Sequence, residues 1–96
     1  MKPSSAIQQH RQAIRDIIER HNARNARVFG SALHGDDTDK SDLDILIDST
    51  GNTSLFDIGA IRAELKELLG IEVDVLTPGS LPDRWKNEVL REAEYL

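Results

Sequence analysis

An alternation of polar and apolar residues between positions 42 and 48 constrains the fold of this chain more than any other feature. Successive side chains of an extended chain point to opposite faces, so every second residue shares a face. Three apolar residues therefore fall on one face and three carboxylates on the other, as expected of a strand with one side in a core. The segment reads, in order, Asp42, Leu43, Asp44, Ile45, Leu46, Ile47 and Asp48.

Asp42 and Asp44 open this strand and point to the same side, with Cα atoms roughly 6.5 Å apart. Two like charges at that spacing repel each other and resist joint ionisation unless a cation lies between them. A hard divalent ion with oxygen ligands, above all Mg²⁺, is the natural occupant.

A Gly30-Ser31 corner follows the apolar pair Val28-Phe29 and precedes Asp42 by ten intervening residues. Such a corner, followed by a turn of helix, offers backbone N–H groups and a hydroxyl to a phosphate. Ser31 could also serve only as a helix N-cap, and the two roles are compatible because they use the same amides. A phosphate site beside paired carboxylates indicates an enzyme that handles nucleotides.

The remaining pattern predicts an α/β (α+β) domain, a small mixed sheet packed with about four helices. Strands are expected at 26–29, 43–47 and 71–76, and helices at 4–22, 31–35, 55–69 and 82–95, with Gly70 ending the third helix. If the last strand lies beside 43–47, Asp74 projects between Val73 and Val75 to the face of Asp42 and Asp44. It would then be a third carboxylate of the same site.

Composition limits the classes of protein to which this chain can belong. The 96 residues suit a single domain, 1–96, and a net charge of −5 argues against broad electrostatic binding to nucleic acid. The absence of cysteine excludes disulfides, thiolate zinc sites and thiol catalysis. The sequence shows no signal-peptide core and no apolar stretch of membrane-spanning length, so a cytoplasmic protein with no membrane contact is expected.

The pattern Gly30-Ser31, Asp42-x-Asp44 and Asp74 resembles the DNA polymerase β-like nucleotidyltransferase superfamily. The resemblance is closest to its minimal nucleotidyltransferases (MNT), single-domain proteins that include antitoxins paired with HEPN-domain toxins. It extends over roughly residues 7 to 95, because the order and length of the elements also agree. It implies a polymerase β-like minimal fold.

The resemblance also implies roles for these residues. Gly30 and Ser31 would hold the triphosphate of ATP, Asp42 and Asp44 would coordinate two Mg²⁺ ions, and Asp74 would bind the catalytic metal and help deprotonate the acceptor. The implied function is an antitoxin that transfers AMP to a tyrosine of a cognate HEPN ribonuclease toxin. Such an antitoxin can form a hetero-oligomer with that toxin. Preference for ATP is weak, because no residue visibly reads the base.

One departure from the family pattern leaves alternatives open. Related minimal proteins commonly carry Gly-Ser-Arg-Ala-Arg-Gly, whereas Ala32, Leu33 and His34 stand between Gly30-Ser31 and Gly35 here. Arg27 or Lys40 could replace the missing charge. The alternatives are an antitoxin that only masks the toxin, or a transferase for a small-molecule acceptor.

Other polar and aromatic residues have a simpler interpretation. Asp48 is expected to be a solvated strand end, and the acids of the connecting loop, Asp36, Asp37 and Asp39, to be solvated as well. The three histidines lack metal-ligand spacing and are expected at the surface. Trp85 and Tyr95, on the predicted last helix, are expected to belong to the core or to a stripe that faces a partner.

Overall fold

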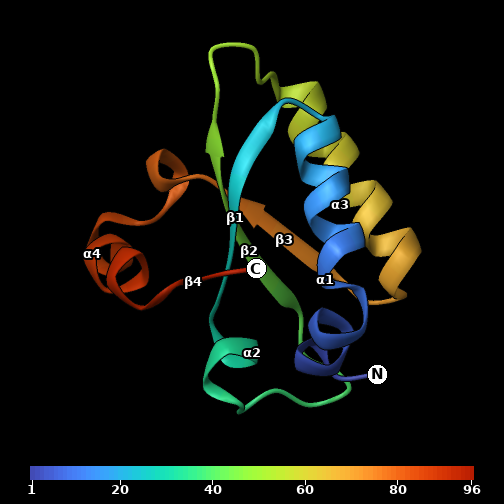
Figure 1. The fold of residues 1–96 in the computed structure, drawn as a ribbon. Helices are drawn as coiled ribbons and strands as arrows, with labels where there is room; N and C mark the ends of the chain where they lie inside the picture. The colour runs from blue at the N-terminus through green and yellow to red at the C-terminus, as the bar shows by residue number, and fades with distance from the viewer.

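The computed structural model describes all 96 residues. Figure 1 shows a sheet with helices on both sides and the N-terminus close to the loop that follows the short second helix. The elements, in chain order, are α1 (Pro3–Arg20), β1 (Ala23–Phe29), α2 (Ser31–His34), β2 (Leu43–Ser49), α3 (Leu55–Leu69), β3 (Val73–Leu76), a 3₁₀ turn η1 (Pro78–Ser80), α4 (Asp83–Glu92) and β4 (Glu94–Tyr95).

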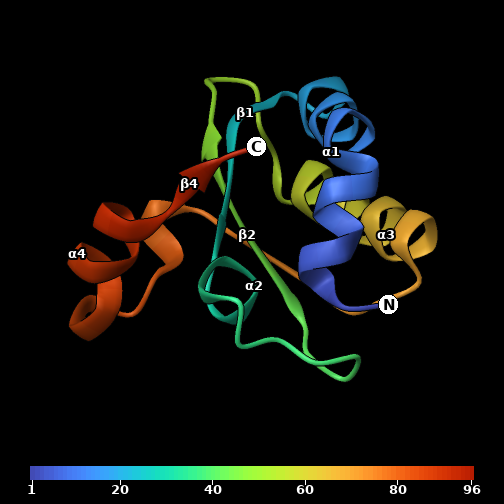
Figure 2. The ribbon, with the colours of Figure 1, turned by 60° about the horizontal axis from the view of Figure 1, so that its bottom comes forward.

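The four strands form one mixed sheet in the order β3-β2-β1-β4. β2 pairs antiparallel with β1 and parallel with β3, and β4 pairs antiparallel with β1. β1 and β2 thus form a hairpin, and the last long strand lies beside the second, the arrangement that brings Asp74 to the face of Asp42 and Asp44. α1 and α3 pack side by side over one face of the sheet, while α4 lies on the other side (Figures 1 and 2).

The core lies between the sheet and the α1–α3 pair. Leu43, Ile45 and Ile47 of β2 have no exposed surface, in agreement with the alternation in the sequence. They pack with Ile14 and Ile18 of α1 in one apolar cluster that also receives residues of α3 and β3. Burial of these side chains is the main stabilising term, because each removes a large apolar area from water. The opposite face of β2 carries Asp44 and Asp48 together with Leu46, which is also fully buried.

Local signals explain where α3 begins and ends. Ser54 caps the helix through a bond that its hydroxyl accepts from the Asp57 amide, and the Asp57 carboxylate accepts one from the Ser54 amide. Gly70 ends the helix in the left-handed region at φ +69°. This capping box and terminal glycine are the sequence signals that define a helix most reliably, and the predicted limits 55–69 are confirmed.

The predicted last helix, 82–95, is wrong at its C-terminal end. α4 stops at Glu92, and Glu94 and Tyr95 pair with β1 as the edge strand β4. The Arg27 guanidinium lies over the Tyr95 ring, with Arg27 Cζ 5.7 Å from the ring centroid. Helical periodicity continued into this segment by chance, and pairing with the open edge of β1 overrode it.

The apolar stripe of the last helix is not part of the core. No residue of α4 is buried, and Trp85 and Tyr95 are 53% and 67% exposed. The expectation of a core role for these two aromatic residues is therefore wrong, and the partner-facing stripe stays a prediction. None of the helices combines the length and apolar character needed to cross a membrane.

Candidate active site

Three carboxylates meet on the face of the sheet that α1 and α3 leave uncovered. Asp44 of β2 and Asp74 of β3 are direct partners in the parallel register, which places them on adjacent strands with their side chains on the same side. Asp42 lies immediately before β2 and two residues from Asp44, so it shares that side. Asp42 and Asp74 are exposed, and Asp44 is half-buried. The predicted convergence of Asp74 with the Asp-x-Asp pair is thus present.

Gly30 lies with its backbone directly against the Asp44 carboxylate. It follows Phe29, the residue of β1 that pairs with Asp44 across the hairpin, and it turns the chain into α2. Its backbone has φ +75° and ψ −151°, a combination that residues with a side chain rarely adopt. A Cβ at this position would lie 2.3 Å from Asp44 Oδ2. A glycine is therefore needed both for the turn and for the carboxylate beside it.

The crowding of acidic groups changes the ionisation of Asp44. Partial burial, followed by repulsion from the charges of Asp74 and Asp42, raises the pKa of Asp44 from 3.8 to about 6. Each of these causes disfavours the ionised form. A bound cation would reverse the effect, because it replaces repulsion between carboxylates with attraction.

The donor set suits a hard divalent cation. None of the ion pairs in the structure includes Asp42, Asp44 or Asp74, so all three charges are without a cationic side chain. Carboxylate oxygens are the ligands that Mg²⁺ prefers. No group of three acidic or imidazole side chains is already arranged as a closed metal cage. The side chains that would complete one, Asp42 and Asp74, are the exposed ones, so they are free to adjust.

α2 supplies the second half of the site. The amides of Ser31 and Ala32 begin the helix and have no intrahelical acceptor, since only later residues reach back to the Gly30 carbonyl. Ala32 is buried in the core cluster, and His34 Nε2 lies 3.1 Å from Glu92 Oε2 of α4. The two positions at which related proteins carry arginine thus serve packing and a contact with α4. Backbone amides and the Ser31 hydroxyl remain as the groups offered to a phosphate.

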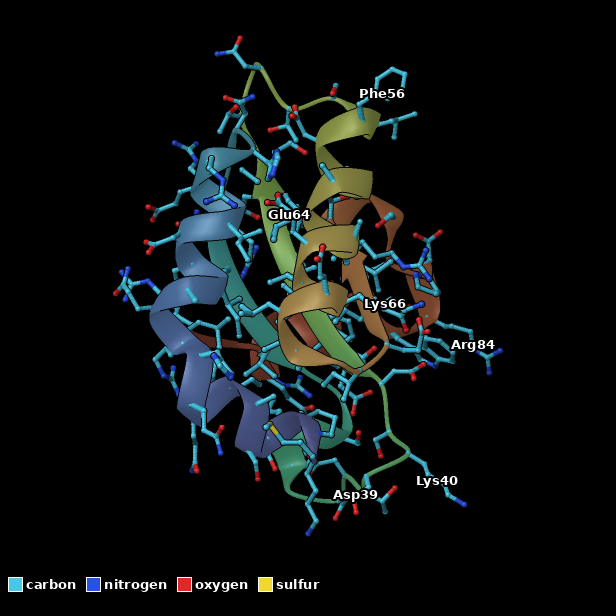
Figure 3. All side chains as sticks on the ribbon, turned by 90° about the vertical axis from the view of Figure 1, so that its right-hand side faces the viewer. Asp39, Lys40, Phe56, Glu64, Lys66 and Arg84 are labelled. Carbon is cyan, nitrogen blue, oxygen red and sulfur yellow. The ribbon has the colours of Figure 1, made fainter.

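Arg27 is not available to replace those arginines. Its guanidinium pairs with Asp48, and its Nε donates to the Asn25 carbonyl at 2.9 Å. Partial burial by itself would raise the pKa of Asp48, but hydrogen bonds from Asn25 and Arg27 outweigh it and hold the pKa below its usual range. The expectation that Asp48 is a freely solvated strand end is wrong, because it is the counterion of a buried arginine. Lys40, on the exposed loop in Figure 3, makes no ion pair.

Asp37 also departs from expectation. Instead of being solvated, it is 5% exposed and accepts hydrogen bonds from the Ser4 amide at 2.7 Å and from the Ser4 hydroxyl at 3.1 Å. The bond from the Ser4 amide is the main reason that the pKa of Asp37 lies below its usual range. Sequence reasoning missed this residue because its partner lies 33 positions away and nothing local marks the contact.

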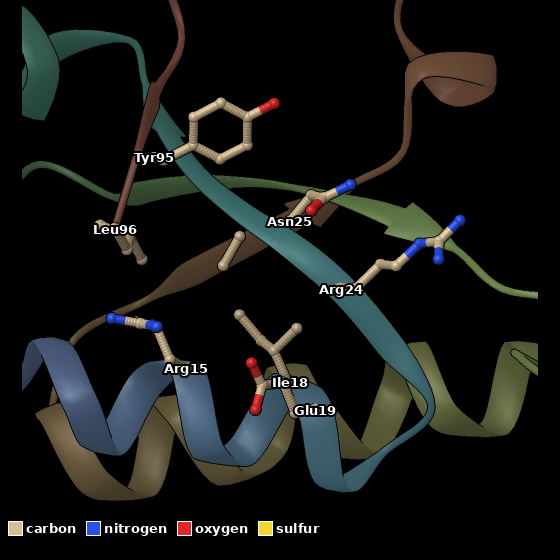
Figure 4. Close-up of a pocket in the computed structure, with 8 residues that line it drawn as sticks. Arg15, Ile18, Glu19, Arg24, Asn25, Tyr95 and Leu96 are labelled. Carbon is tan, nitrogen blue, oxygen red and sulfur yellow. The ribbon is translucent and has the colours of Figure 1, made fainter.

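The cavities of the chain lie away from the carboxylates. One of about 250 Å³ opens between α1, β1 and the C-terminal residues, lined by Arg15, Arg24 and Tyr95 among others (Figure 4). A second of about 160 Å³ lies between α1, α2 and Glu94. Neither includes Asp42, Asp44 or Asp74. The carboxylates stand on an open surface, so the chain itself provides no enclosed acceptor pocket beside them.

Comparison with known proteins agrees with this geometry. Residues 7–96 match the family described as the nucleotidyltransferase domain, so the chain belongs to that family and is a nucleotidyltransferase. A predicted protein adenylyltransferase of Methanocaldococcus jannaschii is 37% identical over 91% of this chain and 94% of its own length. The protein adenylyltransferase MntA of Thermococcus cleftensis is 35% identical over 85% of this chain and 83% of its own length.

Solved structures confirm the fold. The structure of a predicted minimal nucleotidyltransferase superposes with a TM-score of 0.86 at 34% identity, over 97% of this chain and 95% of that one. The crystal structure of a toxin-antitoxin with AMP-PNP shares the fold at a TM-score of 0.70 and 16% identity, over 96% of this chain and 70% of that one. The chain is therefore a minimal member of the family, as the motif predicted.

Proposed function

We propose that the chain is a Mg²⁺-dependent protein adenylyltransferase, acting as a single cytoplasmic domain, that transfers AMP from ATP to a tyrosine of a cognate HEPN ribonuclease toxin. The observation that carries the proposal is the meeting of three unpaired carboxylates beside the Gly30-Ser31 turn. Relatives named as protein adenylyltransferases support the reaction class and the protein acceptor. The toxin-antitoxin with AMP-PNP, which shares the fold of this chain, supports a toxin partner and a nucleotide substrate but not the HEPN identity of that partner.

Each residue of the site has a role in this proposal. Ser31 and the amides that follow Gly30 would bind the triphosphate, and Asp42, Asp44 and Asp74 would hold two Mg²⁺ ions. When bound, the ions supply charge neutralisation at the phosphates and at the attacking and leaving oxygens. Asp74 accepts the proton of the acceptor hydroxyl. The bond from the tyrosine oxygen to the α-phosphorus forms, the bond from that phosphorus to the oxygen bridging to the β-phosphate breaks, and pyrophosphate leaves.

The open site favours an acceptor that another macromolecule presents. Neither cavity adjoins the carboxylates, so nothing on this chain encloses a small acceptor beside them. A protein surface can itself exclude water and orient the hydroxyl, which is where most of the rate of phosphoryl transfer originates. A small-molecule acceptor is therefore less favoured than a protein.

Mass spectrometry of the partner after incubation with the chain, ATP and Mg²⁺ tests the proposal. Each transfer should add about 329 Da, the mass of AMP joined with loss of pyrophosphate. Parallel reactions with the four nucleoside triphosphates test the base, and a strong preference for CTP or UTP would overturn the choice of ATP. The double variant Asp42→Asn, Asp44→Asn should bind the partner but neither modify nor neutralise it, because neither side chain belongs to the core cluster.

The same double variant distinguishes AMP transfer from the alternative, in which the chain only masks the toxin. The two positions at which related proteins carry arginine hold Ala32, which is buried, and His34, which contacts Glu92. The phosphate site therefore lacks arginine, and this favours a non-catalytic antitoxin more than the family pattern would. If the double variant protects cells from the toxin as well as wild type does, simple occlusion is correct and transfer is not.

A further inference from the structure

We propose that Asp37 is a positioning residue for Asp42, because it anchors the loop that carries Asp42 to the first turn of α1. The proposal rests on the proposed function only in giving Asp42 the role of a metal ligand. The contact itself is independent of that role: Asp37 accepts from the Ser4 amide at 2.7 Å and from the Ser4 hydroxyl at 3.1 Å.

The first turn of α1 needs such a partner. Lys2 occupies the N-cap position without a side-chain cap, and no acidic residue lies in the first turn. The first amides of a helix have no intrahelical acceptor, and a negative charge near them is favourable. Asp37 supplies both the acceptor and the charge from 33 residues away, so it acts as the N-cap that the local sequence lacks. Its burial, at 5% exposure, shows that the contact is packed and not a surface encounter.

The same contact fixes one end of the loop from Gly35 to Asp42. Between Asp37 and Asp42 the chain folds on itself, since the Thr38 amide donates to Ser41 Oγ at 2.8 Å and the Ser41 amide to the Thr38 carbonyl at 3.0 Å. The other end is held where the Leu43 amide donates to the Glu72 carbonyl at 2.9 Å. Asp42 lies between these two anchors, so release of the Asp37 anchor frees the segment that leads into it.

Asp39 provides a matched control on the same loop. It is an exposed acid whose only ion pair, with the N-terminal ammonium group, is long at 3.8 Å. Asp39→Ala removes the same charge from the same loop as Asp37→Ala does, without removing the anchor. A difference between the two variants therefore reports the anchor and not the net charge near the site.

Mn²⁺ in the presence of a non-hydrolysable ATP analogue, followed by electron paramagnetic resonance, is the probe. Asp37→Ala should weaken Mn²⁺ binding about tenfold, the lower end of the effect of losing a residue that orients a metal ligand, and Asp39→Ala should stay within about twofold. Asp37→Asn should largely restore binding, because its side-chain carbonyl oxygen can accept from the Ser4 amide. Ser4→Ala, which removes only the 3.1 Å bond, should give an intermediate loss.

Hydrogen exchange of the apo proteins gives a readout without metal or activity. The amides of residues 38–42 should exchange faster in Asp37→Ala than in wild type and Asp39→Ala. The inference is overturned if wild type binds Mn²⁺ and Asp37→Ala binds it equally well, or, should that variant not fold, if Ser4→Ala leaves both affinity and exchange unchanged. If wild type itself binds no Mn²⁺ with the nucleotide, the proposed function fails, while faster exchange of residues 38–42 would still establish the anchor.

Discussion

Substitution of Gly30 by alanine separates the backbone requirement of the turn from the contact with Asp44. The backbone of Gly30 lies in a region almost restricted to glycine, which costs another residue about 1–3 kcal/mol. The new Cβ would also meet Asp44 Oδ2 at 2.3 Å, so the carboxylate must rotate away, at about 0.5–1.5 kcal/mol more. Together these terms predict that Gly30→Ala lowers the free energy of unfolding by about 1.5–4.5 kcal/mol.

Gly35 and Gly70 are the matched controls for this prediction. Both have positive φ, +76° and +69°, but a Cβ on either would meet nothing within 4 Å. Gly35→Ala and Gly70→Ala should therefore cost about 1–2 kcal/mol each, the price of the left-handed region alone. Urea unfolding of the three variants measures the difference. Adding Asp44→Ala to Gly30→Ala should recover about 1 kcal/mol, because the clash partner is gone. Equal losses in all three single variants, with no recovery in the double one, would refute the assignment of Asp44 as the neighbour.

Three further predictions follow from the charges around the site. Because the pKa of Asp44 is raised to about 6, its folded form keeps a proton that the unfolded chain loses, so the contribution of Asp44 to stability should fall by about 1–2 kcal/mol as pH rises from about 4 to about 6. Urea unfolding across this range should show the stability of wild type falling by that amount relative to Asp44→Asn. Arg27→Met should cost about 1–3 kcal/mol, since Asp48 loses its counterion, and should leave nucleotide affinity unchanged in calorimetry. Lys40→Met should do the reverse, leaving stability within about 0.5 kcal/mol while weakening nucleotide binding several-fold.

The parts of the fold that the sequence predicted are those coded by local periodicity and capping. The alternation from Asp42 to Asp48 defined β2 and its buried face, and Ser54 with Gly70 defined the limits of α3. The convergence of Asp74 with Asp44 needed one further assumption, that the last long strand lies beside β2. That assumption is strong because a helix between two strands favours a parallel crossover.

The parts that escaped prediction depend on contacts between distant residues. β4 exists because β1 has an open edge, and the two-residue segment Glu94–Tyr95 has no strand pattern of its own. Asp37 looked like one acid among several in a polar loop, and only the packing of α1 removes it from solvent. Arg27 looked like a spare cation until the hairpin register brought Asp48 to it. In each case the role of a charged residue or short segment depends on a spatial neighbour that is distant in the sequence, so no local pattern predicts it.

The packing around α2 determines how an anionic ligand can be held near Gly30 and Ser31. Ala32 faces the core, His34 contacts Glu92, and Arg27 is paired with Asp48, so none of these three positions offers a free basic side chain to a phosphate. The nearby carboxylates would repel a triphosphate that arrived without cations. Positive charge at this site must therefore come mainly from ions bound to Asp42, Asp44 and Asp74. It follows that nucleotide binding by this chain should depend on a divalent cation more strictly than in relatives that keep the two arginines.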